Sequence, residues 1–114
     1  MKRILFVLAF LIPGFCGMSQ TFSRYREYVT GLPDSLRQEK ADSMMAAGRR
    51  FPWIDGDSLC TFLFAGPAAS VSVAGDMTSW QDGKIRMERI PGTDLWHASV
   101  RFEPDARIDY KIVV

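Results

Sequence analysis

Cysteine and histidine are scarce in this chain of 114 residues, which has two cysteines and one histidine. Cys16 lies in an N-terminal segment that we expect to be removed, and this leaves Cys60 without an internal disulfide partner. One remaining cysteine and one histidine are also too few for a zinc site, so we expect no metal and no cofactor. Cys60 stands in the apolar run 58–64, where its expected role is that of a small buried hydrophobic side chain.

The chain also lacks the Gly-x-Ser-x-Gly motif that places a serine nucleophile on a strand–turn–helix. The single histidine, His97, is predicted to lie on the solvent-facing side of a strand, with no serine or aspartate arranged around it. The carboxylates stand mostly at turns, where aspartate caps backbone amides. We therefore expect this chain to contribute no catalytic residue.

Long apolar runs are absent as well. The unbroken apolar run 4–12 is far shorter than the roughly 20 residues that a membrane-spanning helix needs. Lys2 and Arg3 precede it, Pro13 and Gly14 end it, and Gly17-Met-Ser19 supplies small residues at the −3 and −1 positions of a cleavage site, which is the pattern of a secretory signal peptide. We expect residues 1–19 to be that signal peptide, which predicts a secreted or periplasmic protein without membrane attachment after cleavage.

Lipidation at Cys16 is the alternative to simple cleavage. Phe15, directly before it, is bulkier than the usual lipoprotein signal allows, which favours cleavage after Ser19. Loss of Lys2 and Arg3 leaves 12 basic and 13 acidic residues, a net charge of −1. This balance predicts neither nucleic acid nor an anionic membrane as a partner. The remaining 95 residues are enough for one small domain.

Residues 20–56 are predicted to form a helical lead and a linker. Ser23 is expected to cap a short helix that runs to Tyr28. Asp34 or Ser35 then caps a longer helix, with Gln38 three residues after Ser35 in a capping-box arrangement. This longer helix has a narrow apolar face made by Leu36, Met44 and Met45, and it is expected to end near Gly48. Such a helix needs packing against another element.

Trp53 follows a proline and is expected to pin the linker to the domain after it. Residues 57–114 read as β structure, because short runs rich in valine, isoleucine, phenylalanine and tryptophan alternate with Gly, Pro and Asp breaks. Strands are expected at residues 59–64, 70–74, 85–89, 96–102 and 108–114.

Two of these strands show clear alternation. Apolar side chains fall on one face of 96–102 and polar ones, including His97, on the other. Residues 108–114 behave in the same way, with Asp109 and Lys111 on the polar face. Such alternation is typical of antiparallel sheets with one wet face, as in a β-sandwich. The chain stops at Val114 inside an apolar strand, which predicts that the domain is truncated there and the sequence is a fragment.

The segment Ala74-Gly-Asp-Met-Thr-Ser-Trp80 resembles the core pattern of Ig-like, early-set domains of the glycogen-binding type, which precede isoamylases and branching enzymes. That pattern has an apolar strand, Gly-Asp or Gly-Ser, an aromatic residue, two small polar residues and tryptophan. Here Met77 stands in place of the usual phenylalanine. The later Asp109-Tyr-Lys111 fits the family's aromatic-lysine strand. The resemblance implies an Ig-like antiparallel β-sandwich over residues 57–114.

A second resemblance covers more of the chain. A signal peptide, the helix Pro33-Asp-Ser-Leu-Arg37, the Phe51-Pro52 link and the β region with Gly92-Thr-Asp-Leu-Trp96 follow one another as in the N-terminal part of secreted, enterochelin-esterase-like proteins. This resemblance implies that an α/β-hydrolase domain of the same polypeptide follows and is the partner of this domain. It also implies an ester of a carbohydrate-linked or siderophore-like compound as the substrate of the whole protein.

The resemblance implies a carbohydrate contact at Trp80 and Lys111, the indole stacking on a sugar ring and the ammonium donating to hydroxyl groups. The alternative is that Trp80 folds back over the sandwich or packs on the following domain. Trp96, on the apolar strand face, is expected in the core. Three functions therefore stay open: an accessory domain of an esterase, a module that binds a glucan polysaccharide, and a purely structural sandwich.

Overall fold

The computed structural model describes residues 4–11, 21–47, 51–81, 83–104 and 106–114. Its elements in chain order are β1 (Ile4–Leu11), α1 (Phe22–Thr30), α2 (Asp34–Ala46), β2 (Trp53–Asp55), β3 (Leu59–Ala65), β4 (Ser72–Gly75), the 3-10 turn η1 (Asp76–Thr78), β5 (Ile85–Arg86), β6 (Glu88–Arg89), β7 (Leu95–Arg101) and β8 (Arg107–Val113). None of the helices in these segments is both long and apolar enough to cross a membrane.

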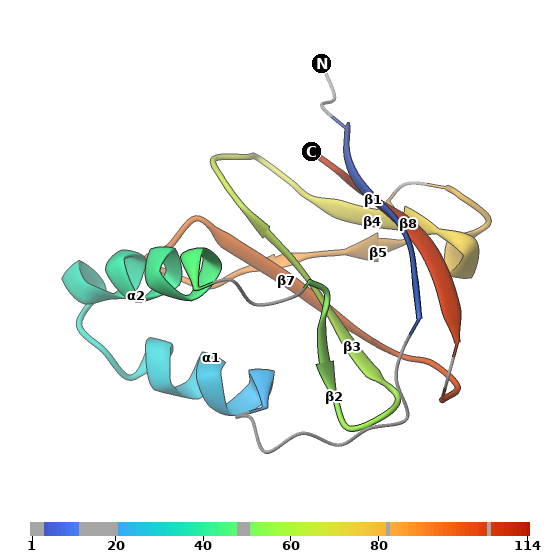
Figure 1. Ribbon diagram of the computed structural model, residues 1–114. Coiled ribbons are helices and arrows are strands. Elements are labelled where there is room, and N and C mark those ends of the chain that lie inside the picture. Colours follow the sequence, from blue (N-terminus) through green and yellow to red (C-terminus); the bar gives the residue numbers. More distant parts are fainter. Residues whose placement is uncertain (1–3, 12–20, 48–50, 82, 105) are drawn as a thin grey trace.

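The described strands form two antiparallel sheets with the orders β1-β8-β4-β5 and β2-β3-β7-β6 (Figure 1). The two sheets share one apolar core, in which Phe62 of β3 lies against Tyr110 of β8 with ring centroids 4.5 Å apart. Trp96 of β7 and Val73 of β4 are buried in this same core, so the expectation for Trp96 is confirmed. The fold is mainly β with antiparallel sheets, as the alternation predicted. Its Ig-like, early-set class stays a prediction.

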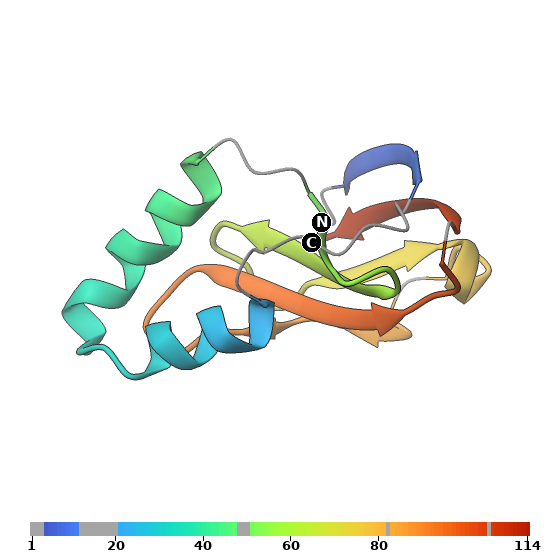
Figure 2. The ribbon, with the colours of Figure 1, turned by 60° about the horizontal axis from the view of Figure 1, so that its bottom comes forward.

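The two helices, which we call the helical layer, cover the outer face of the sheet that contains β7 (Figure 2). Leu95 and Trp96 are consecutive in β7 and therefore point to opposite faces, Trp96 into the core between the sheets and Leu95 towards the helices. Leu95 and Val29 are fully buried there, together with Trp53 of β2. The expectation that Trp53 pins the linker to the sheets is confirmed.

The predicted helix starts were wrong in detail. Thr21, not Ser23, caps α1, because its hydroxyl accepts the backbone N–H of Arg24 at 3.2 Å. The capping box predicted for α2 does not form either, since the helix begins at Asp34 after Pro33 with no side-chain cap. The spacing of Ser35 and Gln38 in the sequence could not show that Gln38 forms hydrogen bonds with Asp94, 56 residues later, instead.

Gln38 instead ties α2 to the turn before β7. Its Nε2 donates to the Asp94 carboxylate at 2.8 Å, and its Oε1 accepts the Asp94 backbone N–H at 2.8 Å. Leu36, which was expected on the apolar face of α2, is exposed. Ala41, Met44 and Met45 instead pack against the apolar cluster between the helices and β7, which includes Phe22 and Leu95. The predicted end of α2 near Gly48 lies outside the described residues.

The expected strand over residues 85–89 is divided between the two sheets. β5 pairs with β4, whereas β6 pairs with β7. Met87 stands between them; its side chain is buried in the core and its backbone N–H donates to the Val71 carbonyl at 2.8 Å. The chain changes sheets at this residue, which the short run of alternating residues did not reveal. β2, with three residues, was not predicted.

β1 lies within the segment that we predict to be a signal peptide. It pairs antiparallel with β8, on the side of β8 opposite β4, and brings Phe6 beside Lys111 in the register. The predicted cleavage site and Cys16 lie outside the described residues. Cleavage therefore stays a prediction, and it would remove the strand that covers this edge of β8.

Candidate functional site

The structure brings Trp80 and Lys111, the two residues predicted to contact a carbohydrate, next to each other. The Lys111 ammonium lies 6.0 Å from the centroid of the Trp80 indole ring, and Trp80 is 45 % exposed. This distance is at the limit of a cation–π contact, worth about 0.5–1 kcal/mol at an exposed position. More than half of Trp80 is buried beside β8, so the expected alternatives, a sugar contact and packing over the sandwich or on a following domain, both stay predictions.

Lys111 points to the outer face of the sheet formed by β1, β8, β4 and β5. Its neighbours in β8, Tyr110 and Ile112, are in the core between the sheets, so the alternation predicted for this strand is confirmed. Lys111 pairs with Ala74 of β4, directly before the turn that carries Trp80. Indole and ammonium thus come from neighbouring strands, and sequence spacing alone could not fix their separation.

The turn after β4 depends on a close approach of two backbones. A Cβ atom at Gly75 would come within 2.4 Å of the Asp109 carbonyl oxygen and 3.0 Å of the Tyr110 Cα. Only glycine leaves this space free, which explains the Gly-Asp pair in the motif. Inside the turn, Gly75 donates its N–H to the Thr78 hydroxyl at 3.1 Å and accepts the Trp80 N–H at 2.9 Å.

Trp80 is held by an unusual backbone conformation. Ser79 and Trp80 have φ angles of 53° and 63°, in the left-handed region that side chains other than glycine seldom occupy. Such residues cost about 1–3 kcal/mol each and cluster where a side chain must be presented in one direction. The sequence offered no signal for this strain, because the pattern Thr-Ser-Trp contains no glycine or asparagine.

Asp76 has a role that sequence reasoning missed. Aspartate at a turn usually caps that turn, but here Thr78 closes the turn, and Asp76 Oδ2 accepts the backbone N–H of Asp109 in β8 at 3.1 Å. This contact joins the turn to the strand that carries Lys111. It therefore helps to set the separation of the indole and the ammonium.

The two outer faces of the sheets differ in what covers them. The helical layer packs on the face of the sheet that contains β7, whereas no α-helix in the described part of the chain lies over the face that displays Lys111 (Figures 1 and 2). Trp80 is exposed and Lys111 is partly exposed on this face, so both side chains can be reached from solvent.

His97 lies elsewhere, and its predicted exposure was wrong. Only 7 % of its surface is exposed, because α1 covers this face of β7 and the Phe22 ring lies 5.1 Å from the imidazole centroid. Burial, followed by the positive charge of Arg26, lowers the pKa of His97 from its ordinary value of 6.5, while Glu88 acts in the opposite direction. Trp80 and Lys111 belong to the other sheet, so His97 is not part of their site.

Cys60 is fully buried in the core, as predicted, and burial raises its pKa to about 12. A thiol with this pKa is protonated at neutral pH and is a poor nucleophile. Within the described residues, no group of three or more His, Cys, Asp or Glu side chains is placed to hold a metal ion.

One comparison with known proteins bears on this arrangement. Residues 59–114 match the protein family described as enterochelin esterase, N-terminal. The matched segment begins at the first residue of β3 and includes both Trp80 and Lys111, while residues 1–58 lie outside it. The match supports the resemblance to the enterochelin-esterase-like group, and it indicates an accessory domain of an esterase family.

No curated protein and no solved structure matches the chain. The residues that match the enterochelin esterase family comprise the strands from β3 onward and do not include the helical layer. The Ig-like relation, secretion and carbohydrate binding remain predictions for this domain.

Proposed function

We propose that this chain is the non-catalytic N-terminal part of a secreted carboxylic-ester hydrolase, which packs beside a following α/β-hydrolase domain and shapes its substrate cleft. The observation that supports this proposal best is the match of residues 59–114 to the enterochelin esterase N-terminal family. The absence of a Gly-x-Ser-x-Gly motif and the burial of His97 under α1 agree with a role outside the chemical step.

The uncovered sheet face suggests how such a domain is used. Its outer surface offers an exposed indole and an ammonium group, whereas the opposite face already carries the helical layer. A partly exposed tryptophan can bury further apolar surface when another domain packs on it. We therefore assign the contact with the hydrolase domain to the face with Trp80 and Lys111.

Two measurements test this proposal. The reading frame beyond the codon for Val114 is expected to continue through an Asn/Asp-Gly-x-Trp turn into a domain with Gly-x-Ser-x-Gly; an immediate stop codon would contradict it. The purified chain is expected to hydrolyse a p-nitrophenyl ester no faster than buffer, and the complete protein to hydrolyse it readily. Any hydrolysis by the chain alone would contradict a non-catalytic role. If it persisted in a His97→Phe variant, the nucleophile would lie elsewhere than at His97.

A glucan-binding module is the second candidate, and the exposed Trp80 beside Lys111 is the observation that favours it. In this case the purified protein is expected to bind glycogen or amylopectin, and Trp80→Ala is expected to weaken binding about tenfold or more, equivalent to about 1.4 kcal/mol. Affinity electrophoresis in gels that contain the polysaccharide measures this effect.

Tyr28→Ala is the matched control, since Tyr28 is a similarly exposed aromatic residue on α1, away from this sheet face. Its binding is expected to equal that of the wild type. No retardation of the wild-type protein by either polysaccharide would exclude the module and leave the esterase proposal as the account of this face.

A further inference from the structure

The helical layer rests on the only histidine of the chain. His97 points outward from β7 into the contact between this sheet and α1, where Phe22 lies against the imidazole. The surrounding cluster is apolar and contains Phe22, Tyr25, Trp53 and Leu95. A neutral imidazole fits such a position, whereas a charged one would have to lose much of its hydration there.

The charged groups around His97 come from several elements. Arg26 of α1 is near enough to disfavour a second positive charge, and Glu88 of β6, directly opposite His97 in the strand register, favours it. Asp55 of β2 already accepts the Phe22 backbone N–H and the Trp53 indole N–H, at 3.1 Å and 2.9 Å. The β3 residue paired with His97 is the uncharged Leu63, and α2 contributes the uncharged Ala41, Met44 and Met45 to this cluster.

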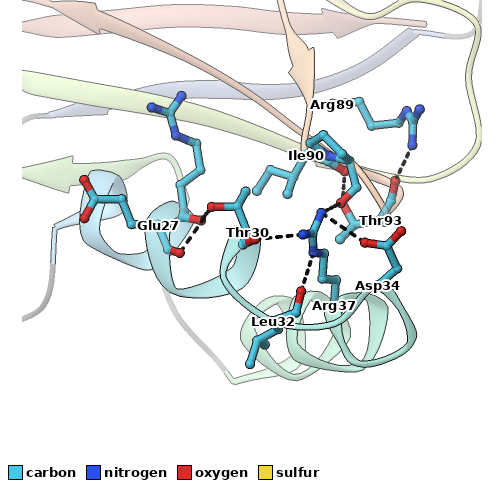
Figure 3. A network of polar contacts seen from close by, with 10 residues as sticks. Glu27, Thr30, Leu32, Asp34, Arg37, Arg89, Ile90 and Thr93 are labelled. Carbon is cyan, nitrogen blue, oxygen red and sulfur yellow. Dashed lines mark hydrogen bonds and ion pairs between the residues drawn. The ribbon is translucent and has the colours of Figure 1, made fainter.

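The polar contacts that hold the helical layer lie mostly at its far end. Arg37 of α2 donates to the carbonyls of Thr30, Leu32 and Pro91 at 2.7, 2.9 and 3.0 Å (Figure 3). Thr30 is the last residue of α1 and Leu32 lies between the helices, so two of these bonds join α2 to the C-terminal end of α1. The bond to Pro91 and the contacts of Gln38 with Asp94 attach α2 to the turn before β7. Near His97 the attachment of α1 depends on apolar packing, on the bond from the Phe22 N–H to Asp55, and on the Tyr25 hydroxyl, which donates to the Lys40 carbonyl of α2 at 3.2 Å.

We propose that His97 makes the attachment of the helical layer sensitive to pH: α1 stays on the sheet while the imidazole is neutral and detaches locally when it is protonated. The pKa of the covered imidazole is lowered, so the stabilisation is complete above the ordinary value of 6.5. It is lost as the pH falls from there towards the lowered pKa, because the uncovered form binds the additional proton. Arg37 holds the C-terminal end of α1 through the Thr30 carbonyl, so opening starts at the N-terminal end of α1, where Phe22 lies against His97.

Hydrogen–deuterium exchange of the purified protein tests this inference. After correction for intrinsic rates, we expect the amides of α1 to exchange at least about threefold faster at about pH 5 than at about pH 7.5, since each unit of pKa shift changes the opening equilibrium up to about tenfold. The amides of β3 and β8 serve as internal controls and are expected to stay protected at both values. Equal protection of α1 at the two pH values would overturn the proposal.

His97→Phe replaces the imidazole by a ring that does not titrate and can still pack on Phe22. In this variant the pH dependence of α1 exchange is expected to disappear, and a dependence equal to that of the wild type would contradict the role of His97. If the phenylalanine variant does not fold, His97→Gln supplies the same comparison. The imidazole signal of the one histidine in proton NMR gives a direct reading, and titration at 6.5 or above in the folded protein would also refute the inference.

Discussion

Replacing Gly75 with alanine is expected to lower the free energy of unfolding by about 3 kcal/mol, at the upper end of the cost of overpacking. The new Cβ atom would lie 2.4 Å from the Asp109 carbonyl oxygen. This oxygen belongs to the backbone of β8, which cannot rotate away as a side chain could. The strand and the turn must therefore move apart, and Trp80 moves with the turn. Urea denaturation followed by circular dichroism measures the change.

Gly56→Ala is the control for this substitution. Gly56 has a φ angle of 63°, and a Cβ atom there would meet nothing within 4 Å. Its cost comes from the left-handed backbone alone and is expected to be about 1 kcal/mol. If Gly75→Ala destabilised the protein no more than Gly56→Ala, the close approach between β4 and β8 would not limit this position.

Trp53→Ala is expected to cost about 3–5 kcal/mol, as is usual for the removal of a buried large aromatic side chain. Only 2 % of Trp53 is exposed, and its ring lies 5.4 Å from Phe22 and 5.7 Å from Tyr25, centroid to centroid. The substitution leaves a cavity under α1 and deprives the Asp55 carboxylate of the indole N–H. Urea denaturation measures the loss, and faster amide exchange in α1 and α2 is expected to accompany it.

Trp80→Ala provides the comparison within the same chain. Because Trp80 is 45 % exposed and its contact with Lys111 is worth about 0.5–1 kcal/mol, its removal is expected to lower the free energy of unfolding by about 1 kcal/mol, well below the loss for Trp53. Similar losses for the two tryptophans would contradict the assignment of Trp53 to the contact between the helical layer and the sheets. A loss of about 3–5 kcal/mol for Trp80→Ala would show that the candidate site contributes to folding.

The best predictions from sequence concerned the strands with long alternation. Trp96 of β7 and Ile108, Tyr110 and Ile112 of β8 face the core between the sheets, as the alternation predicted, because a strand turns each successive side chain to the opposite side. The burial of Cys60 in β3 was predicted instead from the apolar run 58–64. Short segments were harder to predict, as the division of residues 85–89 between two sheets shows. Two residues per strand are too few to display a period.

The candidate site was predictable in its residues and unpredictable in its geometry. The motif around Gly75 and the lysine of the last strand indicated Trp80 and Lys111. The Asp76 contact with Asp109 depends on the antiparallel pairing of β4 and β8, and the positive φ angles at Ser79 and Trp80 have no signal in the local sequence. No local pattern records such a pairing between residues more than thirty positions apart.

The order of amino acids by itself determined the two helices and the long strands β3, β7 and β8, because their patterns depend on neighbours within a few residues. Only the tertiary structure decided what covers each face. The polar face of β7 was expected to meet water, but α1 packs on it and buries His97, while the outer face with Lys111 has no α-helix over it in the described segments. The physical reason is that a helix with a buried stripe of Phe22, Tyr25 and Val29 must bury it against some surface, and the choice of surface depends on the packing of the whole chain.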